Sequence, residues 1–307
     1  MQQMIIFSLL IGVGVIARRV GVLTLSNIPQ FTSLVFNFAM PAIILAGITG
    51  DEVHIEGREL MMVFYAAIVT IGLLIISSAI LSRILGYGKE FHGVIIVMTT
   101  FTNISMMGIP MVYSLFGPSA MIYMTVFLLP YNLLFFSYGY YCLRDRSNQE
   151  KSFNWKNISK ALNPGIIACV VALLLYVVNI EIPNVIAQPI RMLGAVTGPI
   201  SMMLIGSFLV DMNWKEVFSD VKLWFYTLGK MIVIPVIIML IMKQFTDNHL
   251  LLGVLLAAVS TPAGAGVPLL AQALNKKVYP LALKGATFTT LTAVFTMPIV
   301  AIITGLT

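Results

Sequence analysis

Apolar residues occupy most of the chain in long segments, which polar and basic stretches separate. A helix needs about 20 mostly apolar residues to cross the roughly 30 Å hydrocarbon layer of a bilayer. The pattern predicts ten membrane-spanning helices, at residues 4–17, 28–48, 60–81, 92–114, 119–143, 162–180, 186–210, 223–242, 249–274 and 279–304. The expected fold class is therefore an all-α integral membrane protein with ten transmembrane helices.

The composition agrees with a membrane location. Of the 307 residues, 59% are hydrophobic and only 10% are charged, whereas soluble domains carry about 25% charged residues. So few charges cannot cover a water-exposed surface, which excludes a soluble protein. The two cysteines, Cys142 and Cys169, lie far apart without a CxxC or a ligand-spaced histidine. They indicate neither a disulfide framework nor a metal site, and no metal or cofactor is expected.

The basic residues test the number of helices, because cytoplasmic loops of membrane proteins hold the excess of Lys and Arg. With the N-terminus outside, 14 of the 18 basic residues fall on inner loops: Arg18, Arg19, Arg83, Lys89, Arg144, Arg146, Lys151, Lys156, Lys160, Lys215, Lys222, Lys276, Lys277 and Lys284. We therefore expect a multi-pass protein of the cell membrane with both termini outside and the central loop in the cytoplasm. The net charge of +6 reflects this topology, so nucleic acid is not an expected partner.

The chain also contains an internal repeat. A polar, basic loop at 144–163 divides it into a first half, 1–143, and a second half, 164–307, each with five spans. An odd number of spans gives the two halves opposite orientations, as in an inverted repeat. Pro41 and Pro199, and likewise Pro110 and Pro268, are each separated by 158 residues. The sequence therefore predicts two inverted five-helix repeats.

The fourth and ninth spans hold the candidate binding site. Proline and glycine weaken a helix, and a broken helix persists in a membrane only where protein or a water-filled cavity surrounds it. The N-terminal ends of half-helices carry partial positive charge and unpaired N–H groups, which suit an anion. The candidate substrate-binding residues are Asn103, Ser105, Gly108, Pro110, Ser260, Thr261, Gly266, Pro268 and Lys230.

Charged residues are scarce at these depths. None of the 12 acidic residues lies in the middle of a predicted span, and a site without carboxylates favours an anion over a cation. Lys230 is the one clearly intramembrane charge, and it either completes an anion site, reaches the inner surface or pairs with Asp211. The sequence contains no catalytic motif and no P-loop, so we expect neither an enzyme nor an ATP-driven pump.

The segment from Asn103 to Pro110 resembles the N-x-x-x-x-G-[IV]-P motif of the auxin efflux carrier family. Met40-Pro41-Ala42 and Leu204-Ile205-Gly206 are similar to that family's motifs in spans two and seven, and the resemblance extends over essentially the whole chain. It implies a scaffold of spans 1, 2, 6 and 7, and a mobile transport unit of spans 3 to 5 and 8 to 10. It also implies that spans four and nine cross at their prolines and that Asn103 meets the substrate carboxylate.

The expected function is secondary transport of small organic anions by alternating access. The short inner loop and the loose match at Thr261-Pro262-Ala263-Gly264 favour a bacterial-type mono- or dicarboxylate, such as malate, malonate or lactate, over auxin. A sodium- or proton-coupled antiporter or symporter of the same architecture is an alternative, as is a non-transporting membrane sensor. The expected partners are this anion and the lipid bilayer, and the sequence is compatible with a homodimer through spans two and seven.

Overall fold

The computed structural model describes residues 2–49, 57–144, 163–178, 180, 182–210 and 214–306. Up to residue 144 the α-helices are α1 (Gln2–Arg19), α2 (Ile28–Leu34), α3 (Met40–Ala46), α4 (Gly57–Ile84), α5 (His92–Thr100), α6 (Ile109–Phe116), α7 (Ser119–Leu134) and α8 (Tyr140–Leu143). Beyond it they are α10 (Pro164–Val177), α11 (Asn184–Ala195), α12 (Thr197–Val210), α13 (Trp214–Ser219), α14 (Val221–Leu228), α15 (Ile234–Met242), α16 (His249–Ser260), α17 (Gly266–Leu274) and α18 (Tyr279–Ile303). The described residues form no strand apart from one isolated bridge.

Several of these helices are long and apolar enough to cross a membrane. In the described residues, six helical segments meet both conditions: Ile28–Ala46, Gly57–Ile84, Ser119–Leu143, Asn184–Val210, Val221–Met242 and Tyr279–Ile303. Three shorter apolar helical segments accompany them, Ile104–Phe116, Pro164–Val177 and His249–Ser260. The all-α class is confirmed. The inverted repeat and the division into 1–143 and 164–307 stay predictions, and nearly all of the 144–163 loop lies outside the described residues.

Three wide helical turns precede prolines inside the spans. The π-helical turns η1 (Val35–Ala39), η3 (Ile104–Gly108) and η5 (Gly229–Val233) each end two residues before a proline, namely Pro41, Pro110 and Pro235. Proline has no N–H, and its ring clashes with the carbonyl four residues earlier. In each of these turns the residue before the proline donates its N–H to the carbonyl five residues earlier, as Met40 does to Val35, and the helix continues through the proline,. The fourth π turn, η4 (Phe135–Gly139), joins α7 to α8.

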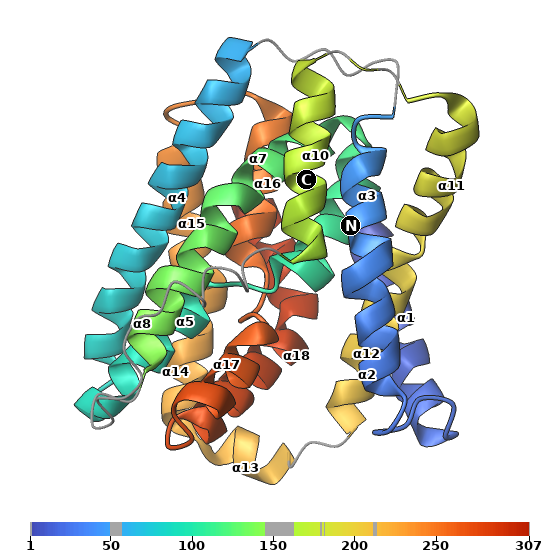
Figure 1. The fold of residues 1–307 in the computed structure, drawn as a ribbon. Helices are drawn as coiled ribbons and strands as arrows, with labels where there is room; N and C mark the ends of the chain where they lie inside the picture. The colour runs from blue at the N-terminus through green and yellow to red at the C-terminus, as the bar shows by residue number, and fades with distance from the viewer. Residues whose placement is uncertain are drawn as a thin grey trace.

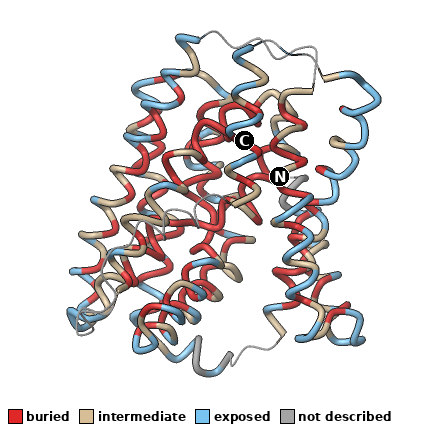
Figure 2. Tube along the Cα trace, viewed as in Figure 1, coloured by how far each residue is buried: buried red, intermediate tan, exposed pale blue. Residues whose placement is uncertain are grey.

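The helices form two neighbouring groups. On the right of Figure 1, α1 packs along α12, and α3 packs against α10 and α11. On the left, α4 packs against α5 and α7, and α16 lies between α7 and α15. Figure 2 shows buried residues concentrated where the helices meet in the centre of the molecule, whereas α11 is largely exposed. The centre of the bundle is therefore where the polar groups of broken helices can be shielded from lipid.

Two glycines allow α1 and α12 to pack closely. A Cβ atom built on Gly14 would overlap the backbone of Met203, and one built on Gly206 would overlap the carbonyl oxygen of Ile11. Small residues of this kind let membrane helices approach until their backbones touch. Gly206 belongs to the span-seven motif in the sequence, and its structural role is this helix contact.

Candidate functional site

Two helices are interrupted near the centre of the molecule, and their interruptions lie side by side. Residues 101–103 separate α5 from η3, and residues 261–265 separate α16 from α17. Thr102 and Ala263 form an antiparallel bridge. The amide of Asn103 donates to the carbonyl of Pro262 at 2.7 Å, and the amide of Gly264 donates to the carbonyl of Phe101 at 2.9 Å. Each interruption thus satisfies backbone groups of the other.

Side chains from neighbouring helices complete this pairing. The Thr102 hydroxyl donates to the carbonyl of Ala258 at 2.8 Å, and the Tyr131 hydroxyl donates to the carbonyl of Thr102 at 2.8 Å. The amide of Ala263 donates to the hydroxyl of Thr289 at 3.1 Å. Non-helical backbone is tolerated at membrane depth only when protein or water satisfies it. These hydrogen bonds give the non-helical backbone the partners that it needs.

The interruptions differ in position from the motif prolines. Pro110 lies in the first turn of α6, and Pro268 is the third residue of α17, so both prolines belong to the half-helices that follow the interruptions. Proline fixes the backbone angle φ near the helical value and is well tolerated in the first turn of a helix. The two interruptions pair several residues before these prolines, at Thr102 and Ala263. The crossing of the spans at their prolines stays a prediction.

A cavity of about 300 Å³ lies beside the paired interruptions. Three of the residues proposed from the sequence line it, Asn103, Ser105 and Gly266. Its other lining residues come from the two interruptions, the start of α17, η1, the α7–η4 segment and the start of α10. They are Phe36, Asn37, Phe101, Thr102, Tyr131, Asn132, Phe135, Phe136, Asn163, Pro164, Gly264, Ala265 and Val267. The described lining contains five aromatic rings and no charged side chain.

Two polar side chains of this lining are free to bind a ligand. Asn103 is only 5% exposed, and neither its amide nor the Ser105 hydroxyl bonds to a group in the described part of the chain. The other three asparagines are engaged: Asn37 donates to Ser33, Asn132 donates to the carbonyl of Leu128, and Asn163 caps α10. A buried amide without a partner is costly. Asn103 is therefore the polar group in this cavity that most needs a ligand.

The N-terminal ends of two half-helices also face this cavity. Asn103 is the residue before η3, Ala265 is the residue before α17, and neither end has a side-chain cap. The backbone N–H groups of Ser105 and Gly266 have no acceptor among the described residues. Unpaired N–H groups and the helix dipole attract an anion. The cavity therefore combines two helix N-termini with one unpaired amide side chain.

Other residues proposed from the sequence lie outside the cavity wall. Gly108, Pro110 and Pro268 are buried. The Ser260 hydroxyl donates to the carbonyl of Leu256 at 2.6 Å, and Ser260 lines a different cavity, of about 240 Å³. Thr261 is fully buried, and its hydroxyl has no partner in the described structure. Of the residues proposed from the sequence, only Asn103, Ser105 and Gly266 line the cavity beside the interruptions.

Lys230 is buried, which excludes one of the three positions that the sequence offered. Its side chain is 0% exposed, so it does not reach the inner surface. Its ammonium group donates to the carbonyls of Val259 and Thr261, at 3.2 and 3.0 Å. Asp211 lies outside the described residues. Lys230 therefore donates hydrogen bonds to carbonyls at the C-terminal end of α16 and does not line the cavity.

Gly264 is a site residue that the sequence reasoning missed. A Cβ atom there would lie 3.0 Å from the carbonyl oxygen of Thr102 and 3.1 Å from that of Phe101, both backbone atoms of the opposite interruption. We expect Gly264→Ala to weaken the pairing and destabilise the protein by about 1–3 kcal/mol. Gly266→Ala is the matched control, because its Cβ would make an ordinary 3.4 Å contact with the end of the Phe135 ring. Thermal unfolding of both variants in detergent tests this, and equal melting temperatures would contradict it.

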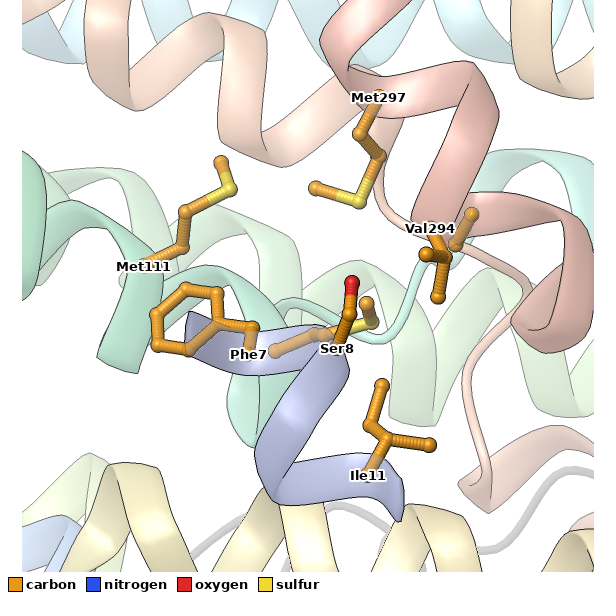
Figure 3. Close-up of a pocket in the computed structure, with 8 residues that line it drawn as sticks. Phe7, Ser8, Ile11, Met111, Val294 and Met297 are labelled. Atoms are coloured by element: carbon orange, nitrogen blue, oxygen red, sulfur yellow. The ribbon is translucent and has the colours of Figure 1, made fainter. Parts of the chain in front are cut away.

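A methionine-rich contact joins α1 to α6 and α18. Figure 3 shows Phe7, Ser8 and Ile11 of α1 facing Met111 of α6 and Val294 and Met297 of α18. The space that these side chains leave is only about 10 Å³, which is barely the volume of one water molecule. Side chains therefore fill the contact of α1 with α6 and α18, and the open cavity is on the side of Asn163.

The comparisons with known proteins agree with a membrane transporter. A family model described as "Membrane transport protein" matches residues 1–301, nearly the whole chain. The chain therefore belongs to this family, which is the family of the auxin efflux carriers. A search of curated proteins finds no match. Membership of a transporter family, together with the apolar helices, establishes a multi-pass membrane transporter and gives no indication of an enzyme.

Proposed function

We propose that this protein is a secondary transporter of small organic anions, and that the carboxylate of the substrate binds in the cavity beside the paired interruptions. The observation that supports this most strongly is the convergence of the Asn103 amide and two uncapped helix N-termini on a cavity without described acidic groups. All three features donate hydrogen bonds or attract negative charge. Asn103, Ser105 and the N–H group of Gly266 would hold the carboxylate.

Between monocarboxylates and dicarboxylates, the lining favours a monocarboxylate with an apolar body. Five aromatic rings, Phe36, Phe101, Tyr131, Phe135 and Phe136, surround the polar corner, and no described lining residue carries a positive charge. A second carboxylate would lose its water without gaining a counter-charge, which costs several kcal/mol. The volume of about 300 Å³ is at the lower end of the range for ligand pockets,.

The cavity is lined by both the predicted scaffold and the predicted transport unit, as alternating access requires. Asn37 and Asn163 come from the predicted scaffold, whereas Asn103 and Gly266 come from the predicted transport unit. A sliding movement between the two would carry the bound carboxylate from one side to the other. The tight contact of α1 with Met111 and Met297 would close the outer side in the present state. The inverted repeat would allow the mirror-image state to open there.

Cation coupling is the alternative reading. A sodium ion would seek the backbone carbonyls of an interrupted helix, and those of Val259 and Thr261 already bind the ammonium of Lys230. This favours transport without sodium. Counterflow of a labelled acid in proteoliposomes, with sodium or choline as the cation, tests both readings. A sodium requirement would support the symporter, and binding without any flux would indicate a sensor.

Ligand binding can be tested with the purified protein. We expect monocarboxylates with apolar bodies to raise the melting temperature, because a ligand that binds only the folded state stabilises it by about 2.7 kcal/mol at 100 times its Kd. The corresponding dicarboxylates, compared at equal concentration, should have a much smaller effect. Stabilisation by the matching amides, which have the same bodies and no charge, would contradict an anion site.

A further inference from the structure

A second cavity, of about 610 Å³, lies among α4, α5, α8 and the connection from α17 to α18. Four basic side chains line it: Arg83 at the end of α4, Lys89 and His92 where the short turn η2 (Lys89–Phe91) meets α5, and Arg144 after α8. All four lie at helix ends on the side that the charge distribution assigns to the cytoplasm. They come from three separate elements of the chain, so the fold brings them together.

These basic groups are not neutralised by the described structure. None of the four side chains forms an ion pair or a side-chain hydrogen bond with a described residue, and Arg144 instead stacks over the ring of Tyr141 at 4.4 Å. Glu90 is the one acidic residue in the described lining. Its carboxylate is folded back against Gly88, within 2.5 Å of where a Cβ on that glycine would lie. The described lining therefore carries more basic than acidic side chains.

The walls of the cavity are held in place by close backbone packing. Gly93, in the first turn of α5, touches the backbone of Cys142 in α8, and any larger side chain at this position would overlap it. Two arginines that line one cavity suit a tetrahedral oxyanion,.

We infer that this cavity binds a phosphate group, either on the headgroup of an anionic phospholipid or as a free phosphate. Arginine binds phosphate through two parallel hydrogen bonds. Arg83 of α4 and Arg144, which follows α8, would do so, with Lys89 and His92 as further donors. Basic pockets between membrane helices on the cytoplasmic side are suited to lipid headgroups. The volume of about 610 Å³ is large enough for a phosphate with its ester substituents.

This site is separate from the substrate cavity, and its existence does not depend on the transported substrate. All the elements around it belong to the predicted transport unit, and Asn275 joins the lining from the end of α17. A phosphate bound here would therefore link the inner ends of α4, α5 and α17. Its expected effect is to raise the stability of this unit in membranes that contain anionic lipid.

The test compares lipid binding by two double variants of the full chain. Arg83→Gln/Arg144→Gln removes two basic groups from the cavity. Arg19→Gln/Lys215→Gln removes two exposed basic groups from the same face of the molecule, at the end of α1 and on α13. Melting temperatures in detergent are measured with added phosphatidylglycerol, phosphatidylcholine or inorganic phosphate. Each basic residue at an anionic surface is worth about fivefold in affinity, so the cavity variant should bind phosphatidylglycerol roughly thirtyfold more weakly.

The outcomes distinguish the sources of the phosphate. Stabilisation of the wild type by phosphatidylglycerol, lost in the cavity variant and kept in the control, supports a lipid site. The same result with inorganic phosphate supports a site for free phosphate. Equal losses in both variants would show that only general surface charge is involved, and equal stabilisation by phosphatidylcholine would show a non-specific lipid effect. Either of these two results overturns the inference.

Discussion

Replacing Asn103 with alanine is expected to abolish carboxylate uptake into proteoliposomes while the protein remains folded. Its amide is the buried polar side chain of the cavity without a described partner, so its loss leaves no new unsatisfied group in the empty protein. A hydrogen bond to a charged group contributes about 1.5–3 kcal/mol, which corresponds to roughly a tenfold to hundredfold loss of affinity. Initial uptake rates and the thermal shift produced by the acid measure this directly.

Asn132→Ala is the matched comparison for this change. Asn132 lines the same cavity, but its amide already donates to the carbonyl of Leu128 at 2.8 Å. We expect a much smaller loss of affinity there, since that donor is already used within the helix. If uptake across a panel of acids were unaltered in Asn103→Ala, or if Asn132→Ala lost as much, the carboxylate site proposed here would be wrong.

Replacing Gly14 with alanine is expected to disrupt the packing of α1 on α12. The added methyl group would overlap the backbone of Met203, which cannot move aside without separating the two helices. Overpacking costs about 1–3 kcal/mol when neighbours can adjust, and more is expected where the obstacle is backbone. Thermal unfolding followed by size-exclusion chromatography should show a melting temperature several degrees lower.

Gly12→Ala provides the control on the same helix. A Cβ atom at Gly12 meets nothing within 4 Å, and alanine is a better helix former than glycine by up to about 1 kcal/mol. Gly12→Ala should therefore leave the melting temperature unchanged or raise it. A similar fall for both variants would mean that the Gly14 effect does not come from helix contact. Gly206→Ala, on the opposite helix, should reproduce the Gly14→Ala result.

The long spans were predictable from the sequence because apolar length alone determines them. Every one of the ten predicted segments coincides with one or more helices in the structure. The short helix α13 (Trp214–Ser219) was not predicted, because six residues with a polar pattern give no apolar run. The π turns were also beyond the sequence reasoning, although the prolines that follow them were visible.

The candidate site was predictable only in part, because some of its residues depend on contacts with residues that are remote in the sequence. Asn103 could be singled out because an amide at membrane depth is costly, and the same signal would have found Asn37 and Asn132. Gly264 could not be distinguished from its neighbours in the sequence. It needs to be small because it lies against Thr102, which belongs to the opposite interruption and is far away along the chain. The partners of Lys230 are backbone carbonyls, and no residue type in the sequence identifies a free carbonyl.

The paired interruptions determine an order of assembly during membrane insertion. Residues 101–103 obtain their backbone partners from residues 262–264, which the ribosome makes about 160 residues later. Until then the fourth span enters the bilayer with unsatisfied N–H and C=O groups, or with water held around them. Its final conformation must therefore wait for the ninth span to leave the insertion machinery. The binding cavity forms late, after the ninth span has entered the membrane, and a product that ends before this span cannot contain it.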